Sequence, residues 1–112
     1  MTPEQFVARL GTDNSLDFED SMALIEAHFD YTPCAFSNGD QHNGAGENAG
    51  SCKILALGQL LGLSEAQTLA CFGRFYRDVL ATPEGSDHAN IRNFMRTGWA
   101  GVHFEGTPLR RR

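Results

Sequence analysis

One thiol occupies a position where its chemistry could be altered. Cys52 follows a glycine-rich stretch, falls in the first turn of a predicted helix and directly precedes Lys53. A helix N-terminus and a neighbouring ammonium both favour negative charge, so the thiolate form of Cys52 could be stabilised. Such a nucleophile needs a base, for which His42 in the preceding stretch is our candidate. The other histidines that could serve are His28, His88 and His103. The alternative, which we favour, is that Cys52 is a small apolar residue at the start of a buried helix.

The same stretch could bind an anion without any catalytic step. Glycine-rich backbone that leads into a helix offers free N–H groups to a phosphate or a carboxylate. The stretch lacks the Gly-Lys-Ser/Thr ending of a nucleotide-binding loop, which argues against nucleotide hydrolysis. Asp40 and Glu47 in this loop would repel an anion unless they turn away. The residues assigned to this candidate anion site are Asn48, Gly50, Ser51 and Lys53, with the amide of Cys52.

A metal site is a weaker interpretation of the same region. Its possible ligands are His28, Asp30, Cys34, His42, Glu47 and Cys52. No Cys-x-x-Cys and no His-Glu-x-x-His spacing occurs among them, so the pattern is more typical of solvated loop residues. We therefore expect no metal and no cofactor.

A second dense polar group stands at the start of a later predicted helix. Asp87 is suited to cap that helix, which would explain its presence. His88 and Arg92 are one turn apart on one helix face and could bind an acidic partner or the acidic half of the chain itself.

Five helices are predicted by apolar spacing and capping signals. They cover about residues 3–10, 16–29, 51–61, 64–82 and 87–97. A polar break is expected at residues 13–15 and a long polar loop at 37–50. Residues 31–36 and 99–105 have the character of strands that could pair. The sequence thus predicts an α+β, mainly α fold, with about five helices around one core and a short two-stranded sheet.

The core is expected where apolar stripes of three helices meet. Its predicted members are Ile54, Leu57, Leu61, Phe72, Phe75 and Phe94. The length of 112 residues fits one domain, spanning residues 1–112.

The charge of the chain argues against one class of binding partner, nucleic acids. The net charge is −5, and it is divided unevenly. Residues 1–50 hold one basic and nine acidic residues, whereas residues 51–112 hold eight basic and five acidic ones. We expect the two halves to attract each other, and the terminal run of three arginines to be a solvated end. An acidic chain is a poor nucleic-acid binder, so no nucleic-acid partner is expected.

The number of cysteines and the hydropathy of the chain indicate the cellular compartment in which the protein is made. Three cysteines at uneven spacing make a poor disulfide framework, and there is no apolar run long enough to span a bilayer. Residues 1–5 lack the features of a secretory signal. We expect a protein made in a reducing cytoplasm, with no structural disulfide and no membrane partner.

Several segments together resemble a known family. They are NAGSCKI at 48–54, FYRDVL at 75–80 and HANIRNFM at 88–95, followed by Gly98-Trp99 and Phe104. The chain is similar to the HopJ-type effector family of small bacterial proteins over about residues 18–109. The resemblance implies a type III secreted effector and carries no catalytic residues across.

The favoured function is a binding or interaction module with a protein partner. The alternative is a small thiol-dependent enzyme, or an anion-binding protein, that uses the helix start at Cys52. An exposed cleft floored by Cys52 with a histidine within about 4 Å would favour the enzyme, because a base must reach the proton that it removes. A buried Cys52 with no cleft would favour the module.

Overall fold

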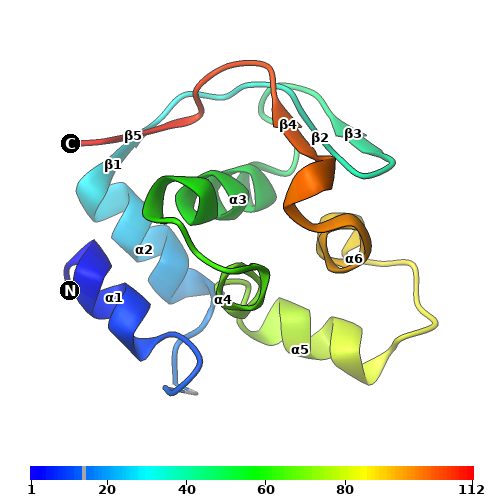
Figure 1. The fold of residues 1–112 in the computed structure, drawn as a ribbon, viewed down its shortest axis with the longest axis horizontal. Helices are drawn as coiled ribbons and strands as arrows, with labels where there is room; N and C mark the ends of the chain where they lie inside the picture. Colours follow the sequence, from blue (N-terminus) through cyan, green and yellow to red (C-terminus); the bar gives the residue numbers. More distant parts are fainter. Residues whose placement is uncertain (14) are drawn as a thin grey trace.

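The computed structural model describes residues 1–13 and 15–112, so Asn14 of the expected polar break lies outside the described residues. The helices found there are α1 (Pro3–Arg9), α2 (Phe18–His28), α3 (Ala49–Leu61), α4 (Glu65–Ala70), α5 (Arg74–Ala81) and α6 (Ala89–Thr97), with a 3-10 turn η1 (Gly98–Gly101). The strands are β1 (Phe29–Tyr31), β2 (Phe36–Asn38), β3 (Gln41–Asn43), β4 (Val102–Phe104) and β5 (Leu109–Arg111). The predicted α+β, mainly α class is confirmed (Figure 1).

Helix α3 lies at the centre of the molecule, with α2, α4 and α6 around it (Figure 1). Ile54, Leu55 and Leu57 of this helix are fully shielded from solvent. All six predicted core residues belong to or pack against one apolar cluster, although Leu61 and Phe75 are only partly buried. This central helix therefore carries much of the apolar burial that stabilises the fold.

The expected helix over residues 64–82 is two helices, α4 and α5, so the described residues contain six α-helices. Gly73 separates them with φ +60° and ψ −128°, a conformation that L side chains rarely adopt. The break is stabilised from α2, because Asp17 Oδ1 accepts hydrogen bonds from the amides of Phe18 and Arg74, both at 2.8 Å. Both hydrogen bonds lower the pKa of the Asp17 carboxyl, and the one from the Arg74 amide has the larger effect. One carboxylate thus caps α2 and receives the first amide of α5.

The structure contains two small antiparallel sheets where one two-stranded sheet was expected. In the first, β1 pairs with β5, so Arg110 and Arg111 belong to a strand, although the side chains of all three terminal arginines are exposed, as expected of a solvated end. In the second, β2 lies between β3 and β4. Strand β3 lies within the expected polar loop, where Gly39 supplies the positive φ of +59° at the turn of the β2–β3 hairpin. Helix α6 packs against β2 and β3.

The two oppositely charged halves of the chain are joined by ion pairs, as expected. Arg74 lies 2.6 Å from Glu19, and Arg111 lies 2.8 Å from Glu4. These pairs are exposed to solvent, so each contributes little to stability.

Candidate functional site

Two helices begin at residues with an unusual backbone conformation. Asn48 precedes α3 with φ 49° and His88 precedes α6 with φ 52°, and these are the non-glycine residues with positive φ in the described part of the chain. Intrahelical bonding starts only at Cys52, whose amide donates to Asn48 O, and at Arg92, whose amide donates to His88 O. No described side chain caps either helix. The amides of residues 49–51 and 89–91 therefore lack intrahelical acceptors.

Asp87 does not cap α6, so that prediction is wrong. The N-cap is His88, and the Asp87 carboxylate instead accepts a hydrogen bond of 2.6 Å from Arg92 Nη2. Arg92 also donates to the carbonyl oxygens of Asp87 and Thr82. The hydrogen bond from Arg92 lowers the pKa of Asp87. Arg92 thus holds the segment before α6 in place and leaves the helix start open.

Asparagines tie the two helix starts to the three-stranded sheet. Asn43 Oδ1 accepts hydrogen bonds from Asn48 Nδ2 at 2.7 Å and from Asn90 Nδ2 at 3.0 Å. Asn38 Nδ2 donates to Asn90 O at 2.7 Å. Asn38, Asn43 and Asn90 are all buried. Because a buried polar network is costly to leave half-made, these bonds fix the relative position of α3 and α6.

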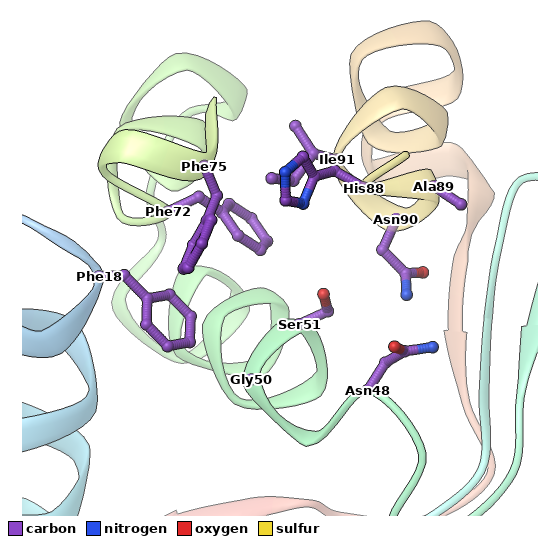
Figure 2. A pocket seen from close by; sticks show the side chains of 10 residues that line it. All are labelled: Phe18, Asn48, Gly50, Ser51, Phe72, Phe75, His88, Ala89, Asn90 and Ile91. Carbon is purple, nitrogen blue, oxygen red and sulfur yellow. The ribbon is translucent and has the colours of Figure 1, made fainter. Parts of the chain in front are cut away.

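A cavity of about 410 Å³ opens where the two helices begin. Its lining residues are Phe18, Asn48, Gly50, Ser51, Phe72, Phe75, His88, Ala89, Asn90 and Ile91. Figure 2 shows the three phenylalanine rings on one side, Asn48 and Asn90 on the other, and the Ser51 side chain between them. The volume falls within the range typical of small-molecule sites.

The apolar wall is built from aromatic contacts. Phe18 and Phe75 meet edge to face, with ring centroids 5.1 Å apart. Phe75 also lies against the His88 ring, with centroids 5.4 Å apart. Gly50 allows this packing, since a Cβ there would meet Phe18 Cζ at 2.8 Å. Phe18 therefore lies directly over the first turn of α3.

No lysine or arginine is among the residues that line the cavity, so any positive charge in its wall comes from the helix starts and His88. Each helix N-terminus carries a partial positive charge of about +0.5, and two of them open into this cavity. The side chain of His88 adds an ionisable group, with Nε2 3.7 Å from the Asp87 carboxylate and 4.0 Å from that of Asp78. The arrangement suits a ligand with an acidic group and an apolar body.

Cys52 is a buried residue at the start of a buried helix, as we favoured from the sequence, and is not an activated thiol. The side chain is 1% exposed, and burial raises the pKa of its thiol to about 12, against only a small lowering effect of Lys53. The neighbouring thiol of Cys34 raises the pKa of Cys52 further. The Lys53 ammonium lies over the Tyr31 ring, 4.8 Å from the centroid. The buried Cys52 does not line the cavity beside it, which argues against the enzyme interpretation, but the presence of that cavity means that the condition set from the sequence for the module is met only in part.

The structure brings only part of the predicted site together. Asn48, Gly50, Ser51 and His88 line the cavity, whereas Cys52, Lys53 and Arg92 do not. His42 lines a different hollow, on the outer face of the three-stranded sheet. Nothing in the spacing of Phe18, Phe72 and Phe75 indicates that they line a cavity, because the same helical spacing is typical of core residues. Asn90 also lines the cavity, and its place among the polar residues near a helix start does not by itself indicate that role.

Two absences apply to residues 1–13 and 15–112. None of their helices has the length and hydropathy needed to cross a membrane. No group of three or more histidine, cysteine, aspartate and glutamate side chains among them is placed to hold a metal ion.

Comparison with known proteins decides the family. Residues 3–109 match the family described as HopJ type III effector protein. The chain belongs to the HopJ type III effector family. A solved structure entitled "Crystal structure of unknown function protein VPA0580" is 53% identical in sequence, with a TM-score of 0.96 over 100% of this chain and 95% of that chain. No curated protein is significantly similar to the chain. The resemblance to HopJ-type effectors that the sequence segments indicated is thereby confirmed.

Proposed function

We propose that this HopJ-family protein is a ligand-binding module and that its site is the cavity between the starts of α3 and α6. The observation that carries the proposal is the meeting of two uncapped helix N-termini with an aromatic wall in one cavity. The ligand is an acidic group joined to an apolar or aromatic body, as at the carboxyl end of a peptide from a protein partner.

The acidic group has a defined place in this arrangement. The amides of Gly50 and Ser51 from α3, and those of Ala89 and Asn90 from α6, lack intrahelical acceptors and can donate to its oxygens. The Ser51 hydroxyl can donate to the same oxygens, and no described carboxylate lines the cavity. A carboxylate fits better than a nucleotide polyphosphate, because no lysine or arginine is present to neutralise several charges.

The apolar body of the ligand has a place beside Phe18, Phe72 and Phe75. Phe72 is buried, whereas Phe18 and Phe75 are only partly buried and so still have surface to offer. Covering that surface with an aromatic ring would remove apolar area from water and add a ring–ring contact. The site thus discriminates by requiring both parts of the ligand at once.

The test uses N-acetylphenylalanine, which carries a carboxylate, an amide and a ring, with its neutral amide as the control ligand. Titration of ¹⁵N-labelled protein should shift the amide resonances of residues 49–51 and 89–91 with the acid and much less with the amide. Ser51→Glu, which places a carboxylate in the cavity, should abolish these shifts. Ser51→Gln, whose side chain has the size of glutamate but no charge, should retain most of them. Shifts that spread over other faces, or that are equal for both ligands, would contradict the proposal.

We further propose that the protein is made in the bacterial cytoplasm and exported by a type III system. The support is the family to which it belongs. A reporter fusion should reach the medium from cells with an intact type III apparatus and stay inside cells that lack it. Equal export from both strains would contradict this route.

A further inference from the structure

A pair of histidines lies on the outer face of the three-stranded sheet, apart from the ligand cavity. In the strand register, Ser37 of β2 is opposite His42 of β3 on one side and opposite His103 of β4 on the other. The residues on either side of Ser37 in β2, Phe36 and Asn38, are buried. His42 and His103 are exposed, so all three side chains of this row belong to the solvent face of the sheet.

The spacing of the row suits a shared ligand. Neighbouring strands lie about 4.8 Å apart, so the two histidines stand about 10 Å apart with Ser37 between them. The serine side chain is too short to separate two imidazoles that lean over it. Both histidines line one hollow of about 510 Å³. Two imidazole nitrogens can therefore meet on one ion above Ser37 at zinc–nitrogen distances of about 2.0–2.1 Å.

Two carboxylates border the same hollow. Glu47 lines it but has one oxygen engaged by the Gly44 amide at 3.1 Å. Glu105 follows β4, and its amide donates to Ala35 O at 3.0 Å, which holds its backbone beside β2. The Glu105 side chain is exposed. The two carboxylates thus add negative charge beside the hollow, which favours a cation there, without forming a three-residue ligand group with the histidines.

We propose that His42 and His103 together bind one divalent transition-metal ion, of which Zn²⁺ is the best match. Neutral imidazole with a carboxylate or water is a donor set that suits zinc and excludes Ca²⁺ and Mg²⁺, which prefer oxygen ligands alone. The described residues contain no group of three or more side chains that could hold a metal ion. The proposed site therefore uses only two protein ligands, both histidines. Reorientation of the two exposed rings forms it, and solvent completes the coordination. It shares no lining residue with the ligand cavity and does not depend on the proposed function.

The experiment is a calorimetric titration of the purified full-length protein with ZnCl₂. One ion should bind per chain, and His42→Ala or His103→Ala should each weaken binding on the order of tenfold or more, the scale of loss that even outer-shell changes cause at metal sites. His28→Ala and Cys34→Ser are the matched controls and should leave binding unchanged. Ser37→Leu should also weaken binding, because the larger side chain fills the space between the rings, whereas Ser37→Ala should not.

Two further readouts separate the proposal from incidental metal binding. Imidazole resonances of His42 and His103 should shift together with the same ion concentration, and those of His28 should not. Affinity should fall as the pH is lowered from about 7.5 to about 5.5, because protons compete for the ring nitrogens. Equal loss on removing any histidine, binding of several ions, or no binding by a folded protein would overturn the proposal. Circular dichroism confirms that each variant is folded.

Discussion

At the scale of single residues, Cys52 shows how burial can outweigh a favourable local position. It has the helix start and the neighbouring lysine that would lower a thiol pKa, yet desolvation raises the pKa to about 12. A charge is costly to bury unless it is paired, and no cation reaches this thiol closely enough. Sequence reveals neighbours along the chain but not the depth at which a side chain lies.

The first prediction concerns thiol reactivity. In the folded protein at pH 7.5, iodoacetamide should modify the half-buried Cys34 and leave Cys52 and Cys71 largely unmodified, because both are buried and protonated. Site-resolved mass spectrometry after brief exposure measures all three thiols at once. Modification of Cys52 as fast as Cys34 would show that the thiol is accessible.

The second prediction follows from the same two pKa values. Cys52 and Cys71 have native pKa values raised to about 12, so between about pH 9 and 12 the unfolded chain releases protons that the folded protein keeps. The stability that these thiols contribute is present below pH 9 and is lost as the pH rises through this window.

Urea unfolding at pH 8 and pH 10.5 measures this alkaline loss of stability. The variant with Cys52→Ala and Cys71→Ala should start less stable but lose less on going to the higher pH. An equal loss in both proteins would show that other groups account for the pH dependence.

At the scale of elements, two capping boxes could be predicted from spacing, but the cap at the start of α6 and the breaks imposed by packing could not. Thr2 with Gln5 and Ser64 with Gln67 form the capping boxes that their spacing indicates. The break at Gly73 was missed because the apolar spacing continues through it. What fixes the break is Asp17, which is more than fifty residues away in the sequence.

In the candidate site, too, local features could be predicted from the sequence and long-range contacts could not. Asn48, Gly50, Ser51 and His88 could be named from composition and from the helix start that follows each group. Their meeting in one cavity depends on Asn43, which lies in a strand that was expected to be loop. Long-range hydrogen bonds of this kind leave no periodic signal in the sequence.

The third prediction tests the break between α4 and α5. Gly73→Ala should destabilise the protein clearly, because the backbone has positive φ and a Cβ would meet the Phe18 amide at 2.5 Å. Gly46→Ala is the matched control, since Gly46 also has positive φ but nothing lies within 4 Å of the added atom. Thermal unfolding should show the larger fall for Gly73→Ala. Equal falls would mean that the contact with α2 is unimportant.

At the scale of the whole molecule, one apolar cluster links residues from α1 to β5. Phe6 near the first end and Leu109 near the last belong to the same cluster as the α3 residues. The length of the chain and its apolar stripes predicted such a core. Which elements close it was not predictable, because the β1–β5 pairing joins residues about eighty positions apart.

The fourth prediction addresses this core. Leu57 is fully buried at the centre of α3, so Leu57→Ala should reduce the free energy of unfolding by about 2–5 kcal/mol. Leu60→Ala is the control on the same helix, because that side chain is about half exposed and should cost far less. Urea denaturation measures both. An unchanged midpoint for Leu57→Ala would show that α3 does not organise the core.

The chain ends lie beside each other (Figure 1), with Arg111 paired to Glu4 and His28 bonded both to Met1 O and to the Arg112 amide. Such closeness allows circular permutation: residues 1 and 112 can be joined by a short linker and new ends opened at the exposed turn of residues 45–46. In that permutant no peptide bond would connect β3 to α3. Asn43 would then hold the start of α3 only through its bond to Asn48. If the cavity keeps its ligand there, noncovalent contacts suffice to assemble it.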